Sequence, residues 1–417
     1  MLDFSQVFRQ LESKLGILKR EAEEYPELLD KLLKLLSSPL PDEEEVRSLL
    51  TGDRSCLAIL GDLALPTSEW GASSIPPSFR IGEFNAGETW ALEALEDTTV
   101  IATDSGMITP DHHILPLMAV LNKGYYAAYY NREGTSCFEG SECELKVGEE
   151  LFLQRGGELR LMNWADRDAW AYEGEFSMAV KAAEQVEGTR PAVLLLDRPL
   201  SLTYAMDRRQ RDKAKLIAVV RKWLIKLREA ELIPVGVYFS AARSVCNTLL
   251  RAVLCFEVSS CSHCRSAWRA RRKDGWAPLC REAMVVSDSL LYSRILSPGE
   301  RSPIFKAYNK ATAKALDVLF FYVKAGEGVL RVEIPEWAMP EAELVHRVVC
   351  AQAALAGGYP YAMIRAHENA VVTGRERAAF YGLVDRFLAS KGIAPPGGGP
   401  PGVKLTRKAK LKMRTVV

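Results

Sequence analysis

Hydrophobic positions along the chain recur with two periods, one typical of helices and the other of strands. Five large apolar residues near the start recur at helical spacing: Phe4, Phe8, Leu11, Leu15 and Leu18. We expect residues 1–50 to be helical, either as an arm that contacts a partner or as a helical pair packed on the main domain. Residues 64–95 contain several Pro, Gly and Ser residues. They predict an irregular connection and a domain boundary near residue 95.

Strands and helices then follow in an informative order. Three runs favour strands joined as a meander, with a hairpin turn at Asn122-Lys123-Gly124: residues 98–104, 114–121 and 124–130. A helix, a strand, a helix and a strand are expected next: residues 165–186, 191–197, 207–231 and 233–240. This is the order of a ribonuclease H-like α/β fold, a mixed sheet with flanking helices. Val318–Lys324 and Val329–Pro335 predict a further hairpin.

Two of these strands lead into an aspartate. Asp104 follows a β-branched run and precedes Ser105-Gly106, where we expect a sharp turn, and Asp197 follows an apolar run. In a ribonuclease H-like sheet these two strands are neighbours. Because Mg²⁺ and Mn²⁺ take hard oxygen ligands, two adjacent carboxylates predict a site for two divalent cations.

The helix between these strands offers a third carboxylate. Glu175 is our first choice because it lies on the face expected to meet the sheet, and Glu173 is the alternative. A carboxylate on a helix is more often only a solvated surface group. The two aspartates favour a metal-binding role for one of this pair.

Tyr238 and His367 are further candidates for the same chemistry. The Tyr238 hydroxyl, near the end of a strand, can hold a phosphate or a metal-bound water, or simply pack at the sheet edge. A lone histidine is more often structural than catalytic. The neighbouring Arg365 and the position of His367 after the last strand keep a metal or phosphate role open.

A cysteine-rich segment spans residues 246–283. Four of its cysteines can close a tetrahedral Zn²⁺ site: Cys255, Cys261, Cys264 and Cys280. Cys255 can instead be a buried thiol, with His263 as the fourth ligand; an iron–sulfur cluster and free thiols are the alternatives. Arginines interleave with Trp268 and Trp276, as in proteins that bind single-stranded nucleic acid: Arg269, Arg271 and Arg272. A solvated basic loop is the simpler interpretation.

The composition limits the environment in which this chemistry takes place. The formal charge is +1, so attraction to nucleic acid must come from local patches. No apolar run approaches the ~18 residues of a membrane span, and no signal peptide is evident. Nine cysteines, an odd number, favour a reducing cytoplasm. A Pro/Gly linker and a tail with six basic and no acidic residues follow at 393–417, so the predicted domains are 1–95 and 96–392 with that tail.

Several stretches together resemble the NurA nucleases over residues 96–392. They occur in family order: VIATDSG, LLLDRPLS, PVGVYFSAARS, SDSLLYSRILSPGERSPIF and YPYAMIRAHENAVV. The resemblance implies an Mn²⁺- or Mg²⁺-dependent deoxyribonuclease that cuts single- and double-stranded DNA, with 5′→3′ exonuclease and single-strand endonuclease activity. It further implies a homodimer docked on a hexameric HerA-type ATPase and a role in DNA end resection during double-strand break repair.

The resemblance also assigns residues. Asp104 and Asp197 match the strand-end metal ligands, Glu175 or Glu173 the helical glutamate, Tyr238 the family aromatic and His367 the family histidine. Two loops depart from the pattern: Ser105-Gly106 stands where the family often has Gly-Ser, and Arg198 where it often has Gly. Arg198 would bring a cation close to the metals, where it can hold a phosphate. Alternatives are a non-catalytic DNA-end clamp or translocase adaptor that uses the cysteine-rich basic segment, and another ribonuclease H-like enzyme.

Overall fold

The computed structural model describes residues 3–36, 44–46, 48, 63–84, 89–111, 116–155, 157–202, 204, 210–239, 246, 249–250, 286–308 and 316–393. The chain divides into two compact units that alternate along the sequence. The first comprises Met1–Ala94, Arg198–Tyr204 and Val235–Tyr359, and the second comprises Leu95–Asp197, Ala205–Pro234 and Pro360–Val417. Among the described helices, none is long and apolar enough to cross a membrane.

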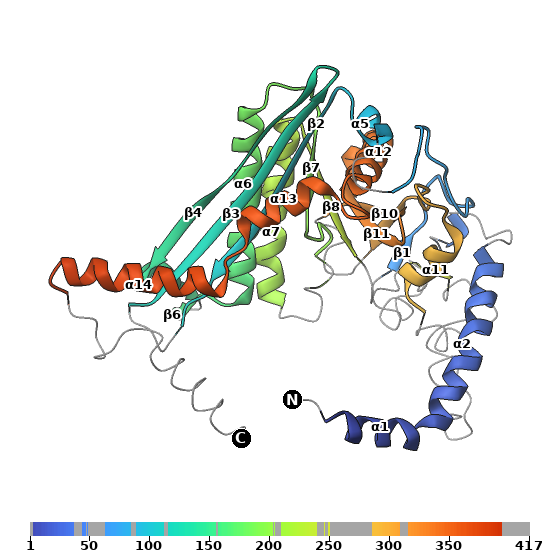
Figure 1. Cartoon of the computed structure of the whole chain (residues 1–417), viewed down its shortest axis with the longest axis horizontal. Coiled ribbons are helices and arrows are strands. Elements are labelled where there is room, and N and C mark those ends of the chain that lie inside the picture. The colour runs from blue at the N-terminus through green and yellow to red at the C-terminus, as the bar shows by residue number, and fades with distance from the viewer. Residues whose placement is uncertain are drawn as a thin grey trace. The chain divides into compact units, whose positions relative to one another are not determined.

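The second unit is built on a mixed sheet with the strand order β7-β2-β3-β4 (Figure 1). Its strands are β2 (Thr98–Ile108), β3 (Met118–Asn131), β4 (Gly134–Val147) and β7 (Ala192–Leu196). β2 and β3 are antiparallel, as are β3 and β4, whereas β2 and β7 are parallel. An antiparallel meander flanked by a parallel fourth strand is the ribonuclease H-like arrangement, so the predicted fold class is confirmed.

Helices cover this sheet. α6 (Trp164–Gln185) contacts β2 and β3 and packs on α7 (Gln210–Glu229), while α13 (Tyr361–Ala370) crosses β2, β3 and β4 (Figure 1). Asn163 caps α6 by accepting hydrogen bonds from the Ala165 and Asp166 amides. The unit is completed by a 3₁₀ turn η1 (Gly148–Leu151), a small hairpin of β5 (Phe152–Arg155) and β6 (Glu158–Leu161), and α14 (Gly374–Ser390).

The predicted turn at Asn122-Lys123-Gly124 is wrong. These residues lie within β3, and the meander turns instead at Arg132-Glu133 before β4. Gly124 is not a turn residue. A Cβ atom there would lie 2.3 Å from the Ala366 carbonyl oxygen, so glycine is needed because the α13 backbone passes close to the strand.

The first unit contains strands in the order β1-β9-β10-β11-β8, with β8 belonging to it from Val235 onward. They are β1 (Leu63–Leu65), β8 (Leu232–Phe239), β9 (Phe305–Tyr308), β10 (Val318–Ala325) and β11 (Gly328–Pro335). The predicted hairpin of β10 and β11 is confirmed. The helices are α1 (Phe4–Ser13), α2 (Leu15–Leu36), α5 (Thr89–Ala94), α11 (Asp288–Ile295), η6 (Glu336–Glu341) and α12 (Ala342–Ala354).

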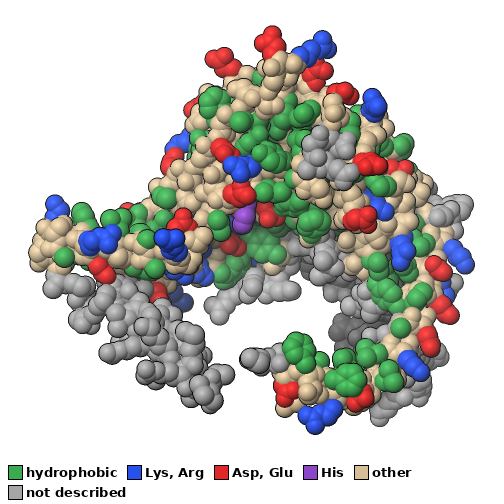
Figure 2. All heavy atoms as spheres, in the orientation of Figure 1, with side chains coloured by type: hydrophobic (Ala, Val, Ile, Leu, Met, Phe, Trp, Pro, Cys, Tyr) green, Lys and Arg blue, Asp and Glu red, His purple; other side chains and the backbone are tan. Residues whose placement is uncertain are grey.

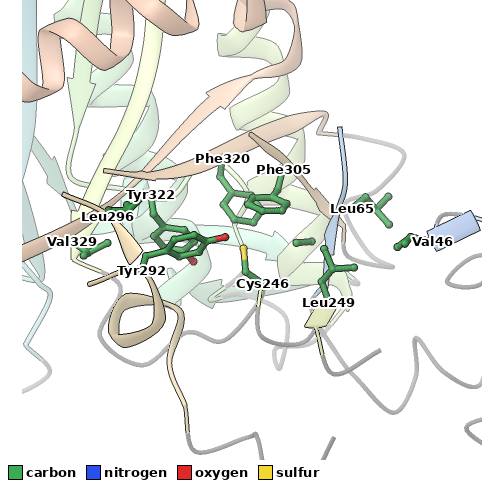
Figure 3. Packing of buried hydrophobic residues seen from close by; sticks show 11 residues of the cluster. Val46, Leu65, Cys246, Leu249, Tyr292, Leu296, Phe305, Phe320, Tyr322 and Val329 are labelled. Carbon is green, nitrogen blue, oxygen red and sulfur yellow. The ribbon is translucent and has the colours of Figure 1, made fainter. Parts of the chain in front are cut away.

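The core of the first unit is aromatic (Figure 3). Tyr292 from α11 stacks on Tyr322 from β10, with ring centroids 4.9 Å apart, and Phe305 stacks on Phe320 at 5.6 Å. These rings are buried together with Cys246. A stacked aromatic pair contributes about 0.5–1.5 kcal/mol to stability beyond the effect of its buried area. The Tyr292–Tyr322 pair therefore stabilises the packing of the short helix α11 on the sheet.

The N-terminal segment is helical, as predicted, and its two halves differ in burial. Leu29, Leu32 and Leu36 of α2 pack into a buried cluster, whereas Phe4 and Phe8 of α1 are exposed. Figure 2 shows hydrophobic side chains at the surface of α1 and along α14. The connection over 64–95 is more regular than expected because β1 pairs with β9, and Glu69 accepts two hydrogen bonds from Arg301.

Candidate active site

The two predicted aspartates occupy equivalent places on neighbouring parallel strands. Thr103 of β2 pairs with Leu196, the last residue of β7, so Asp104 of β2 and Asp197, which directly follows β7, come next along the two chains. The predicted turn after Asp104 is wrong, because β2 continues to Ile108 and pairs with β3 throughout. Asp104 therefore lies within a strand, at the level where β7 ends.

His367 on α13 meets Asp104. Its Nδ1 lies 2.7 Å from Asp104 Oδ2, while Asp104 Oδ1 accepts a hydrogen bond of 2.7 Å from the Ser105 amide. An ionised carboxylate only accepts hydrogen bonds, so Nδ1 carries the proton. The His367 side chain is 63% exposed and that of Asp104 19%. The pair is therefore open to solvent on the imidazole side, where a large substrate can reach it.

Glu175 and Glu173 point to different surroundings. Glu175 is 1% exposed and accepts a hydrogen bond of 2.5 Å from Ser105 Oγ, next to Asp104. Glu173 is half exposed and lies 3.8 Å from the Lys222 ammonium group on α7. This geometry favours Glu175 over Glu173 as the third carboxylate. Ser105, which was expected only as a turn residue, contacts both carboxylates, that of Asp104 through its amide and that of Glu175 through its hydroxyl.

Asp104 and Glu175 belong to opposite faces of the sheet. Asp104 pairs with Gly124, which lies under α13, whereas Ser105 pairs with Lys123, which packs against Gly174 of α6. Lys123 is buried, and its ammonium group lies 3.0 Å from the Glu142 carboxylate. In the described part of the chain, no group of three or more His, Cys, Asp or Glu side chains is close enough together to hold a metal ion.

The donor chemistry nevertheless fits a divalent cation. Asp104 and His367 already lie within hydrogen-bond distance, and Asp197 stands at the same level of the adjacent strand. Carboxylate oxygens and an imidazole nitrogen are suitable ligands for Mg²⁺ or Mn²⁺.

Tyr238 and Arg198 belong to the first unit. The Tyr238 hydroxyl donates a hydrogen bond of 2.6 Å to Glu333 Oε1, so this contact gives it a structural partner. The Arg198 backbone passes over β8, since a Cβ atom on Gly236 would lie 2.5 Å from the Arg198 carbonyl oxygen. The roles expected of Tyr238 and Arg198 toward a phosphate stay predictions.

A fully buried charged group was missed by sequence reasoning. Glu333 on β11 accepts hydrogen bonds from the Ser201 amide and hydroxyl, at 2.8 and 2.9 Å, and from Arg331 Nε at 2.8 Å. Burial alone raises the pKa of Glu333. The Arg331 charge and the hydrogen bonds outweigh this effect and hold the pKa below its usual value. Glu333 thereby fastens the segment that follows Asp197.

The predicted zinc and DNA-contact residues cannot be compared with the structure. Cys255, Cys261, Cys264 and Cys280 lie outside the described residues, as do Arg269, Arg271 and Arg272. The same is true of the basic tail. The zinc site and the basic DNA-binding surface therefore stay predictions.

Comparisons with known proteins identify the family. A solved NurA bound to dAMP and manganese aligns over 90% of this chain and 97% of its own, with 9% identity and a TM-score of 0.35. The catalytic domain of human endonuclease V aligns over 85% and 100%, with 12% identity and a TM-score of 0.30. The comparison with curated proteins gave no match. The NurA domain model matches residues 98–372, well over half of the 417 residues, and the chain therefore belongs to the NurA family of nucleases.

Proposed function

We propose that this protein is a metal-dependent deoxyribonuclease whose active site is built on the β2–β7 edge of the second unit. The observation that carries the proposal is the contact of His367 with Asp104, at the level where Asp197 follows the parallel neighbouring strand. An acidic pair with an adjoining imidazole, open to solvent on one side, suits a polyanionic substrate that reaches the ligands from outside.

Each residue has a defined task in this mechanism. Asp104 and Asp197, together with Glu175, would hold the cations. When bound, a pair of Mg²⁺ or Mn²⁺ ions supplies a lower pKa for the attacking water and charge neutralisation at the phosphate. Because Asp104 accepts from Nδ1, the Nε2 atom of His367 remains for the substrate side. His367 would there ligate the second cation through an unprotonated Nε2, or, after Nε2 takes up a proton from solvent to give the imidazolium, donate that proton to the leaving 3′ oxygen.

The finer activities rest on family membership. The protein would have 5′→3′ exonuclease and single-strand endonuclease activity and would act in the cytoplasm. It would work as a homodimer bound to a HerA-type hexameric ATPase, and the two together would resect DNA ends during double-strand break repair. Tyr238 and Arg198 would orient the scissile phosphate. The cysteines of residues 246–283 would hold a structural Zn²⁺, and the arginines between them would contact DNA.

The test is cleavage of an end-labelled linear DNA with Mn²⁺, Mg²⁺ or EDTA. We expect cleavage with a divalent cation, none in EDTA, and none by Asp104→Asn, which keeps the side-chain shape but removes the charge. Glu175→Gln should lose activity as well, whereas Glu173→Gln on the same helix should keep it. Cleavage in EDTA or normal turnover by Asp104→Asn would refute the mechanism.

A non-catalytic outcome is also distinguishable. If the wild-type protein binds DNA but cleaves none with any cation, the assay is repeated with a HerA-type hexamer added. Absence of cleavage in that assay would favour a non-catalytic translocase adaptor over a nuclease.

A further inference from the structure

Four residues on one face of β2 and β3 form the surface that α13 crosses. Asp104 lies opposite Gly124, and Gly106 lies opposite Asn122, as paired residues of the antiparallel ladder. Residues two apart on a strand share a face, so all four side chains belong to the α13 side. Two corners of this square are glycine, one is the aspartate that contacts His367, and the fourth is Asn122.

The glycines set the distance between the helix and the strands. A Cβ atom on Gly106 would lie 2.3 Å from the Ala370 carbonyl oxygen, and one on Gly124 would lie 2.3 Å from that of Ala366. These atoms are backbone and cannot rotate away. The last turn of α13 therefore rests directly on the strand backbone, and a polar group is needed beneath its carbonyl oxygens.

Asn122 supplies that group. Its Nδ2 donates hydrogen bonds to the carbonyl oxygens of Asn369 and Ala370, at 2.9 and 3.0 Å. The last carbonyls of a helix have no partner within the helix, so these two bonds satisfy groups that would otherwise be left without one. The Asn122 Oδ1 accepts from the Cys143 thiol at 3.2 Å, which orients the amide.

We infer that Asn122 is a positioning residue for His367: by capping the C-terminal turn of α13, it sets where the imidazole lies relative to Asp104. The capped turn contains the reactive group, because the Val371 amide donates to the His367 carbonyl oxygen at 2.9 Å. Loss of the cap allows this turn to lift from the glycines and carries the imidazole away from the aspartate. The inference rests on the nuclease function proposed above.

A second contact ties α13 to the sheet but differs in position. Arg365 donates two hydrogen bonds to Glu139 on β4, at 3.0 and 2.7 Å. Both side chains are about one-third exposed, so solvent weakens this ion pair. It secures the helix before His367, whereas Asn122 secures the turn after it.

The experiment uses the full-length protein and the variant Asn122→Asp. Aspartate has nearly the same shape, but it has no N–H and would place negative oxygens against two carbonyl oxygens. The matched control is Asn131→Asp on the same strand, where the Asn131 side chain accepts a hydrogen bond from the Glu133 amide, a bond that aspartate can also accept. Both changes are also made together with His367→Ala.

We expect Asn122→Asp to lower kcat about ten- to a hundredfold with little change in KM, since displacement of a catalytic group by about 1 Å costs that much. In the His367→Ala background, the same change should alter the rate less than about twofold, because the two residues act as one unit. Equal effects in both backgrounds would make Asn122 merely structural and overturn the inference.

Hydrogen exchange provides a readout without catalysis. In Asn122→Asp, the amides of residues 366–371 should exchange faster while those of β2 and β3 keep their rates. Unchanged exchange in the last turn of α13 would overturn the inference even if activity fell. If the wild type cleaves no DNA even with a HerA-type hexamer added, the proposed function fails, whereas faster exchange would still establish that Asn122 holds the helix.

Discussion

Replacement of Glu333 by glutamine should destabilise the first unit severely. Glu333 and Arg331 are both fully buried and two residues apart on β11, so their side chains share one face. The guanidinium group lies 3.6 Å from the Phe320 ring centroid and cannot reach water. Glu333→Gln removes the carboxylate that contacts Arg331 Nε and leaves the guanidinium group buried with a hydrogen bond to the Tyr322 hydroxyl.

The expected loss follows from this geometry. Removal of one partner of a buried ion pair costs about 3–5 kcal/mol, because the remaining charge stays desolvated. The single NH2 group of glutamine also faces a donor in either orientation, because the Ser201 amide donates to Oε2 and the Tyr238 hydroxyl donates to Oε1. Arg331→Met combined with Glu333→Gln should restore most of the stability, since it removes both charges.

Urea unfolding followed by circular dichroism measures the effect, with the change in midpoint multiplied by the slope m. The control is Glu336→Gln. Glu336 pairs with Lys306 at the surface and should cost less than about 1 kcal/mol. Because the pKa of Glu333 is lowered when folded, its contribution is complete above its ordinary value of 4.5 and is lost as the pH falls below it. A loss no larger than that of the control would refute the reasoning.

Three further outcomes are expected. Burial lowers the pKa of His346 from 6.5 to about 4, so the unfolded chain binds a proton at a higher pH than the folded protein does. The free energy of unfolding should therefore decrease by about 3 kcal/mol as the pH falls from 6.5 to 4. In urea unfolding at a series of pH values, His346→Leu should reduce this dependence on pH. Gly124→Ala should cost about 1–3 kcal/mol in thermal or urea unfolding because of the Ala366 oxygen, whereas Gly374→Ala, with open space around it, should not. Removal of residues 403–417 should weaken DNA binding and flatten its dependence on salt; an unchanged salt slope would show that the tail makes no phosphate contacts.

The elements and the fold class could be predicted because they depend on local periodicity. The apolar runs before Asp104 and Asp197 are β2 and β7, and the helical pattern over 165–186 is α6. Their order along the chain is that of the ribonuclease H-like sheet, in which β2 and β7 are parallel neighbours. The spacing of apolar residues along the chain indicates whether a segment is a helix or a strand and which of its faces is buried. The order of the segments indicates the fold class because consecutive elements usually lie next to one another.

Two glycines could not be placed correctly from their neighbours in the sequence. Gly106 and Gly124 predicted turns, since glycine permits positive φ, but both lie in strands under a helix that is about 250 residues distant in the sequence. Nothing in the neighbouring residues separates a turn glycine from one that allows a close backbone approach. That distinction depends on where α13 packs.

The different surroundings of Glu175 and Glu173, and the ion pair of Arg331 with Glu333, depend on the tertiary structure as well. Glu175 and Glu173 differ by two positions on one helix, yet one is buried beside Ser105 and the other faces Lys222. Arg331 and Glu333 are both buried because β11 lies inside its sheet, between β10 and β8. The sequence by itself determined the fold class, the helix α6 and most of the strands, although the two runs expected as separate strands over 114–130 are the single strand β3 and β4 was not predicted. Only the packing of distant segments decided which side chains meet, because burial and charge compensation are properties of the assembled sheet and not of any one stretch.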